Sequence, residues 1–142
     1  MSVELDVRAF LLGPGAAISG CSAGFTFVGP MRPSKGGFPA EAVTIQEYGG
    51  PQPHGYLDGR NQTYRQVDVQ IRVRGAIGGY LPTKNRADRI WNALNRCSGS
   101  SFSSATRSYI RIEPLTSGPQ FLGEDDTESP EFALSVRLGH HT

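Results

Sequence analysis

The sequence predicts an α+β fold, with one domain over residues 1–142 in which a mixed or antiparallel sheet of about four to five strands packs against two helices. Three observations lead to this prediction. Several segments alternate apolar and polar residues, which is typical of strands with one buried face. Two segments carry apolar residues at helical spacing. The length suits one domain that buries its own core.

The first predicted helix covers residues 3–12. Ser2 suits its N-cap position, and Gly13-Pro14 would end it. Its apolar residues share one face: Val3, Val7, Phe10 and Leu11. Residues 13–40 are rich in Gly, Ser, Ala and Pro, so we expect an irregular segment, interrupted by a short strand over residues 25–28.

Two further strands are predicted over residues 42–48 and 64–74, separated by a long loop over residues 49–63. The loop holds Gly, Pro, Asp and Asn and has few apolar anchors. The strand 64–74 has two different faces. Its apolar face consists of Val67, Val69, Ile71 and Val73. Its polar face consists of Gln66, Asp68, Gln70, Arg72 and Arg74. One packed face and one polar face fit a sheet that helices cover on one side.

The second helix is predicted over residues 82–96, with Pro82 in its first turn. Its apolar stripe consists of Ala87, Ile90, Trp91 and Leu94. We predict that Trp91 faces the sheet and anchors the core. The last two strands are predicted over residues 108–113 and 131–138.

A displayed loop over residues 119–126 is predicted to join these last two strands. Phe121-Leu122 would form an apolar tip that either docks on a partner or folds back onto the chain's own core. The segment Glu124-Asp125-Asp126, followed by Glu128, is interpreted as a solvated acidic tip or as a contact for a partner's basic patch. A metal site is a third alternative, although the spacing of an EF-hand is missing.

Composition excludes several classes of function. The net charge of +1 gives no overall attraction to nucleic acid or to an anionic membrane. No stretch approaches the ~20 apolar residues of a membrane-spanning helix, and no signal peptide is visible, so we expect a soluble protein made in a cytoplasm. Cys21 and Cys97 lack metal-ligand spacing, and a disulfide between them is the alternative to free thiols. Arg outnumbers Lys twelve to two, which suits protein–protein contacts or reflects coding bias.

No catalytic motif is present. His54 falls in the Gly/Pro-rich loop, and His140-His141 are interpreted as a frayed C-terminal tail rather than a ligand pair. Gly75-Ala76-Ile77-Gly78-Gly79 lies between a strand and a helix but lacks the spacing of a phosphate-binding loop. We therefore predict no enzymatic activity, no cofactor and no metal site.

Four segments, in this order, resemble the tail terminator (minor capsid or tail completion) proteins of tailed bacteriophages. They are Glu47–Pro51, Val67–Arg74, Ala87–Leu94 and Pro119–Leu138. The resemblance implies a virion protein, assembled in the host cytoplasm, that forms a usually hexameric ring at the head-proximal end of the tail tube. Its partners would be the tail tube protein and a head-completion or connector protein, with genomic DNA passing through the lumen without specific binding. No membrane is implied.

The ring hypothesis assigns candidate interface residues. These are Arg65, Arg72, Arg74, Arg111, Phe121, Leu122, Glu124, Asp125, Asp126 and Arg137. The strand arginines would pair with the acidic segment of a neighbouring subunit; the alternative is cross-strand pairs within one chain. The loop 49–63 is a candidate for ordering on assembly. Two other functions stay open, a head-completion or stopper ring protein and a small cytoplasmic α+β binding module.

Overall fold

The computed structural model describes residues 3–33, 39–50, 54–55, 63–97, 108–124 and 128–141. Within these ranges the helices are α1 (Val3–Leu12), α2 (Ala16–Ser19) and α3 (Tyr80–Arg96). The strands are β1 (Thr26–Val28), β2 (Ala42–Gly49), β3 (His54–Gly55), β4 (Thr63–Arg74), β5 (Ser108–Pro114), β6 (Gln120–Glu124) and β7 (Pro130–His141). The predicted α+β fold, with a sheet packed against helices, is confirmed.

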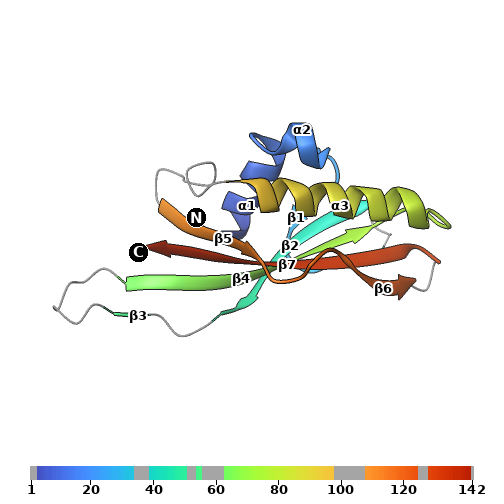
Figure 1. Cartoon of the computed structure of the whole chain (residues 1–142). Helices are drawn as coiled ribbons and strands as arrows, with labels where there is room; N and C mark the ends of the chain where they lie inside the picture. The colour runs from blue at the N-terminus through green and yellow to red at the C-terminus, as the bar shows by residue number, and fades with distance from the viewer. Residues whose placement is uncertain are drawn as a thin grey trace.

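All seven strands form one mixed sheet with the order β1-β2-β4-β7-β5. The short β3 pairs with the start of β4, beyond the reach of β2, and β6 pairs with the start of β7, beyond the reach of β5. Only β1 and β2 are parallel among the described pairs; the others are antiparallel. Figure 1 shows β4 and β7 running through the middle of the sheet.

The pairing of β4 with β7 is the longest in the sheet, and it runs without a break from Tyr64 opposite His141 to Arg74 opposite Glu131. Because side chains alternate between faces along a strand, this register places the apolar residues of both strands on one face. They are Val67, Val69, Ile71 and Val73 of β4 and Phe132, Leu134, Val136 and Leu138 of β7, all at most 2% exposed. The predicted apolar face of strand 64–74 is confirmed.

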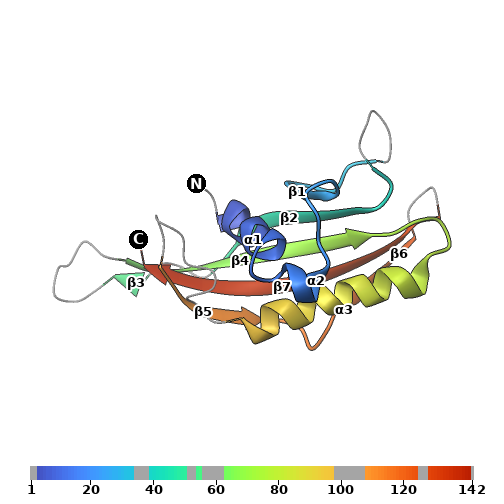
Figure 2. The same ribbon diagram turned by 90° about the horizontal axis from the view of Figure 1, so that it is seen from above.

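The helices cover this apolar face only (Figures 1 and 2). Helix α1 packs on β1 and β2, α3 packs on β4, β5 and β7, and α2 lies against both long helices. The predicted face of α1 is buried, and α3 buries Ala87, Ile90 and Leu94 in the same core. Trp91 lies instead at the rim, half-buried, where its Nε1 donates a hydrogen bond of 3.0 Å to the Thr116 carbonyl. Trp91 therefore packs against the core from its edge, as a partly buried residue rather than the predicted central anchor, because the indole N–H needs an acceptor that the apolar centre does not offer.

Three other expectations need correction. Gln120–Glu124 form strand β6 rather than part of a loop, because their backbone pairs with β7 around a bulge between Phe121 and Gly123 that disturbs the alternation. Helix α2 lies in the segment 13–40 that we expected to be irregular outside its short strand. His54–Gly55 form β3 within the predicted loop 49–63, whereas residues 51–53 and 56–62 of that loop lie outside the described ranges.

The C-terminal histidines also differ from expectation, since β7 continues to His141 and His140 is only 3% exposed. The ring of His140 lies edge-on to that of Tyr109, with centroids 5.6 Å apart. The Tyr109 hydroxyl donates a 2.5 Å hydrogen bond to Oδ2 of Asp6, which is also buried. This hydrogen bond joins α1 to β5, near the C-terminal end of β7.

Both cysteines are free thiols. Burial raises the pKa of the Cys97 thiol to about 11, and burial likewise raises the pKa of Cys21. The reactive species of a cysteine is the thiolate. Both side chains are therefore protonated and unreactive at neutral pH in the folded protein.

We expect Tyr109→Phe to lower the free energy of unfolding by about 2 kcal/mol, because the buried Asp6 carboxylate loses a hydrogen bond. Urea unfolding measures this change. Tyr48→Phe is the matched control, since Tyr48 is 53% exposed and the change there should stay within about 0.5 kcal/mol. Equal effects at the two positions would contradict the role of the Tyr109 hydroxyl.

We also expect both thiols to react slowly with an aromatic disulfide reagent at about pH 8 in the folded protein and rapidly in denaturant. Burial withholds the thiolate in the folded state, and unfolding removes that effect. Absorbance of the released thiol measures both rates. Fast reaction of either cysteine in the folded protein would show that its thiol is not shielded as described.

Candidate functional site

The strand register places most of the predicted interface arginines on the face of the sheet opposite the helices, and no helix covers that face (Figure 1). We call it the helix-free face. The register of β4, β5 and β7 places its charged residues there, and they are Asp68, Arg72, Arg74, Arg111, Glu113, Glu131 and Arg137. The alternation that buries the apolar residues on the other side therefore gathers these charges on one surface.

Arg137 and Asp68 lie directly opposite each other on β7 and β4. The guanidinium donates two hydrogen bonds to the carboxylate, of 2.7 Å from Nε and 3.0 Å from Nη2. The hydrogen bond to Asp68 raises the pKa of Arg137 above its ordinary value. On the other side of β7, Glu113 lies opposite Arg137, and its Oε2 is 2.8 Å from Nη2 of Arg111. Charges of alternating sign thus form a row across three strands.

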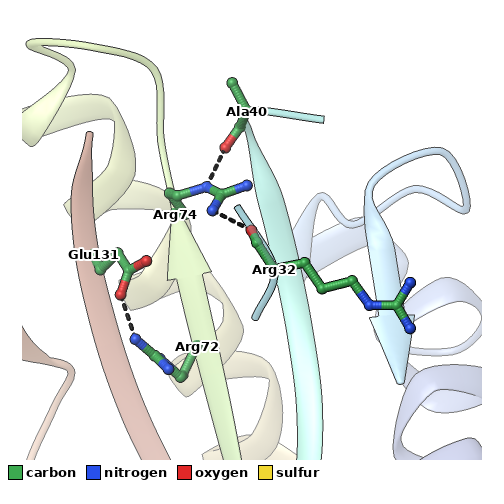
Figure 3. A network of polar contacts seen from close by, with 5 residues as sticks. All are labelled: Arg32, Ala40, Arg72, Arg74 and Glu131. Atoms are coloured by element: carbon green, nitrogen blue, oxygen red, sulfur yellow. Dashed lines mark hydrogen bonds and ion pairs between the residues drawn. The ribbon is translucent and has the colours of Figure 1, made fainter. Parts of the chain in front are cut away.

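Arg72 and Arg74 lie at the other end of β4 (Figure 3). Arg72 pairs with Glu131 of β7, which lies two residues along the strand from Ala133, the residue directly opposite Arg72. Arg74 is 2% exposed and uses its guanidinium on backbone carbonyls: Nε donates to Ala40 at 2.7 Å, Nη1 to Arg32 at 2.5 Å and Nη2 to Pro39 at 2.8 Å. The rigid fork of donors in an arginine suits this arrangement.

Arg65 is placed differently from the other predicted arginines. It lies opposite the buried His140, so the register puts it on the face that the helices cover. Its Nη2 is 3.7 Å from Oε1 of Glu47, and its side chain is 51% exposed. Each of the five predicted arginines therefore has a partner inside its own chain, as in the intrachain alternative. Contact of any of them with a second subunit stays a prediction.

The predicted apolar pair lies on β6 rather than on a loop tip. The Phe121 ring contacts Tyr80 and Phe132, with both pairs of centroids 5.2 Å apart. Phe121 and Leu122 nevertheless stay 48% and 49% exposed. Three other exposed apolar residues belong to the first turn of α3 or just precede it, and the start of α3 lies at the same end of the sheet as β6 (Figure 1). Together they form the apolar end patch, which consists of Ile77, Tyr80, Leu81, Phe121 and Leu122.

The apolar end patch adjoins an open edge of the sheet and an acidic rim. Among the described strands, β6 pairs only with β7, so its other backbone edge has no strand beside it. Glu124 at the end of β6 is exposed, as is Glu128, whose carbonyl accepts a 3.4 Å hydrogen bond from the Gly78 amide. The predicted residues Asp125 and Asp126 lie outside the described ranges.

A pocket between α2 and α3 was missed by sequence analysis, because α2 lies in the segment expected to be irregular. It encloses about 230 Å³ and is lined by Ser19, Gly20, Pro82, Asn85, Arg86 and Arg89. Arg86 stacks on the Phe25 ring at 4.7 Å, and its Nη1 is 3.8 Å from Oε2 of Glu41. We call it the α2–α3 pocket. Its walls carry two guanidinium groups and no carboxylate.

The described ranges contain no group of three or more His, Cys, Asp or Glu side chains that could hold a metal ion. No described helix is long and apolar enough to cross a membrane. The chemistry on these surfaces is that of ion pairs, hydrogen-bond donors and exposed apolar side chains.

No protein-family model and no curated protein matches the chain. Among solved structures, the chain is similar to a chain of the structure described as "Virion of native gene transfer agent (GTA) particle". The TM-score is 0.59 at 16% sequence identity, and the match covers 99% of this chain and 92% of the other. The two chains therefore share a fold over nearly their whole lengths.

We expect Arg74→Met to lower the free energy of unfolding by about 3 kcal/mol, because three backbone carbonyls lose their donor. Urea unfolding measures the loss. Arg65→Met is the matched control, because Arg65 is half exposed and its ion pair is long, so the change should stay within about 1 kcal/mol. A loss at Arg74 no larger than at Arg65 would contradict the structural role of this guanidinium.

Proposed function

We propose that this chain is a structural protein of a phage-like virion that acts as a tail terminator. In this proposal it forms a ring, usually a hexamer in this family, at the head-proximal end of the tail tube. The ring stops polymerisation of the tube protein and offers a surface to the head-completion or connector protein. The observation that carries the proposal is the fold shared with a chain of a gene transfer agent virion over 99% of this chain.

The surfaces of the chain support assembly rather than catalysis. Isolated exposed apolar residues are ordinary, but the apolar end patch gathers five large ones beside an open strand edge. Such an edge offers unpaired backbone groups to another chain. A ring needs two different surfaces on each subunit, because its contacts are heterologous. The apolar end patch supplies one candidate for such a surface.

The helix-free face fits the passage of DNA better than its binding. Its arginines are held by acids or by backbone carbonyls. Asp68 holds Arg137, and the carbonyls of Arg32, Pro39 and Ala40 hold Arg74. Proteins that bind DNA neutralise phosphates with cations that are free to reach them. A surface of satisfied charges would let the genome move through a ring without specific contacts.

Negative-stain electron microscopy of particles made by cells with a nonsense mutation in this gene tests the proposal. We expect overlong tail tubes and unattached filled heads, because nothing would stop growth of the tube. A complementing wild-type copy of the gene is the control and should restore joined particles.

Two other results would redirect the proposal. Free tails of normal length beside leaking or empty heads would assign the chain to head completion, the alternative ring function. Intact and infectious particles would overturn a structural role in the virion and favour a small cytoplasmic binding module. A monomeric purified protein would point the same way, since a terminator must form a ring.

A further inference from the structure

The charged side chains that lack an intrachain partner are distributed unevenly over the molecule. Within the described ranges, the cations without an ion pair or side-chain hydrogen bond are Arg32, Lys84, Arg89 and Arg96. The corresponding acids are Asp88, Glu124 and Glu128. Most of these cations belong to α3, whereas two of the acids flank the end of β6. Positive and negative charge therefore remain unsatisfied on two different surfaces.

On α3, part of this charge is balanced locally and part is not. Asp88 follows Lys84 by four residues, a spacing at which opposite charges on a helix compensate each other. Arg89 is exposed and forms no ion pair with any acid in the described part of the chain. Its Nη1 lies 3.5 Å from the position that a Cβ would take at Gly20. Gly20 and Arg89 both line the α2–α3 pocket, so the guanidinium forms part of its wall.

The α2–α3 pocket has the chemistry of an acceptor-binding site. Arg86, Arg89 and the Asn85 amide bring donors to its wall, and no carboxylate lines it. An ionised carboxylate is purely an acceptor and forms its strongest hydrogen bonds with guanidinium groups. The pocket is open, and its 230 Å³ exceed the volume of a single carboxylate, so a side chain carried on a protein segment can enter it.

The acidic end of β6 has the complementary chemistry. Glu124 and Glu128 are exposed and stand at the end of the sheet, while α2 lies above the middle of α3 on the helix side (Figure 1). The strand arginines that could have neutralised these acids are already occupied within the chain, as Arg72 is by Glu131. In an assembly of two copies, the pocket of one copy can reach the acids of the other.

We propose that the α2–α3 pocket of one subunit binds the acidic end of β6, through Glu124 and Glu128, of the next subunit. This inference rests on the proposed ring and names its electrostatic contact. When the contact is made once at each junction it is heterologous and can repeat around a closed ring. The adjoining apolar end patch would bury its side chains at the same junction, and the ion pairs would set the orientation of the subunits.

Charge reversal on the full-length protein tests this contact, with size-exclusion chromatography and multi-angle light scattering over a range of concentrations at low salt. Arg89→Glu should raise the concentration at half-assembly at least about tenfold, since like charges would then meet across the junction. The double variant Glu124→Lys/Glu128→Lys should have a similar effect. Combining both sets of changes should restore assembly to within about threefold of the unmodified protein.

Arg96→Glu is the matched control, because Arg96 is exposed, unpaired and on the same helix but does not line the pocket. It should change assembly by less than about threefold. Circular dichroism melting of every variant shows whether the fold is kept, as expected for exposed positions.

The outcomes separate this inference from the proposed function. A ring that forms equally well with Arg89→Glu overturns the contact and leaves the terminator proposal standing. Loss of assembly in Arg89→Glu without rescue by the reversed acids shows that another group occupies the pocket, and it overturns Glu124 and Glu128 as the occupants. An unmodified protein that stays monomeric at every concentration overturns the ring and this contact together.

Discussion

The pairing of β4 with β7 is the constraint on which the rest of the structure depends. A shift of one residue in this register would turn Val67, Val69, Ile71 and Val73 away from the helices and bury charged side chains in their place. The same register aligns Asp68 with Arg137, so the core on one face and the ion pairs on the other specify one alignment together. Strands β2, β5 and β6 pair with this central pair and α3 packs on it, whereas α1 packs on β1 and β2.

The two faces of that pair are stabilised by different interactions. Burial of apolar surface dominates on the helix side. On the helix-free face the exposed pair of Arg111 and Glu113 contributes modestly to the free energy of folding, whereas Asp68 and Glu131 are buried and need their arginine partners. Arg74 differs from these arginines, because it is itself buried and its charge is met by three carbonyl dipoles rather than by an acid. Removing its charge from water is costly. The carbonyls of Arg32, Pro39 and Ala40 must therefore hold their positions against the end of β4.

Sequence alternation and helical spacing predicted those elements whose burial repeats with a regular period. The long strand β4, helix α1 and most of α3 are of this kind. Strand β6 was missed because its bulge between Phe121 and Gly123 breaks the period of two, and helix α2 was missed because four residues are too few to show a helical period. The α2–α3 pocket therefore had no sequence signal, since it depends on where α2 lies against Arg89. Sequence analysis left two alternatives for the partners of the strand arginines, an acid of a neighbouring subunit or an acid of the same chain. The alternation of a strand places a side chain on one face of the sheet but does not determine which residue lies next to it.

Intrachain pairing changes which residues can mediate assembly. An arginine already bonded to an acid, such as Arg137, must give up two hydrogen bonds before it binds another chain, so it adds little net free energy to an interface. A cation such as Arg89, which is exposed and has no partner within the described ranges, loses no intrachain hydrogen bond when it binds another chain. The apolar end patch similarly gains burial only when another surface covers it. Interface residues of this chain are therefore better sought among the side chains that folding leaves unsatisfied than among the most conspicuous charges of its strands.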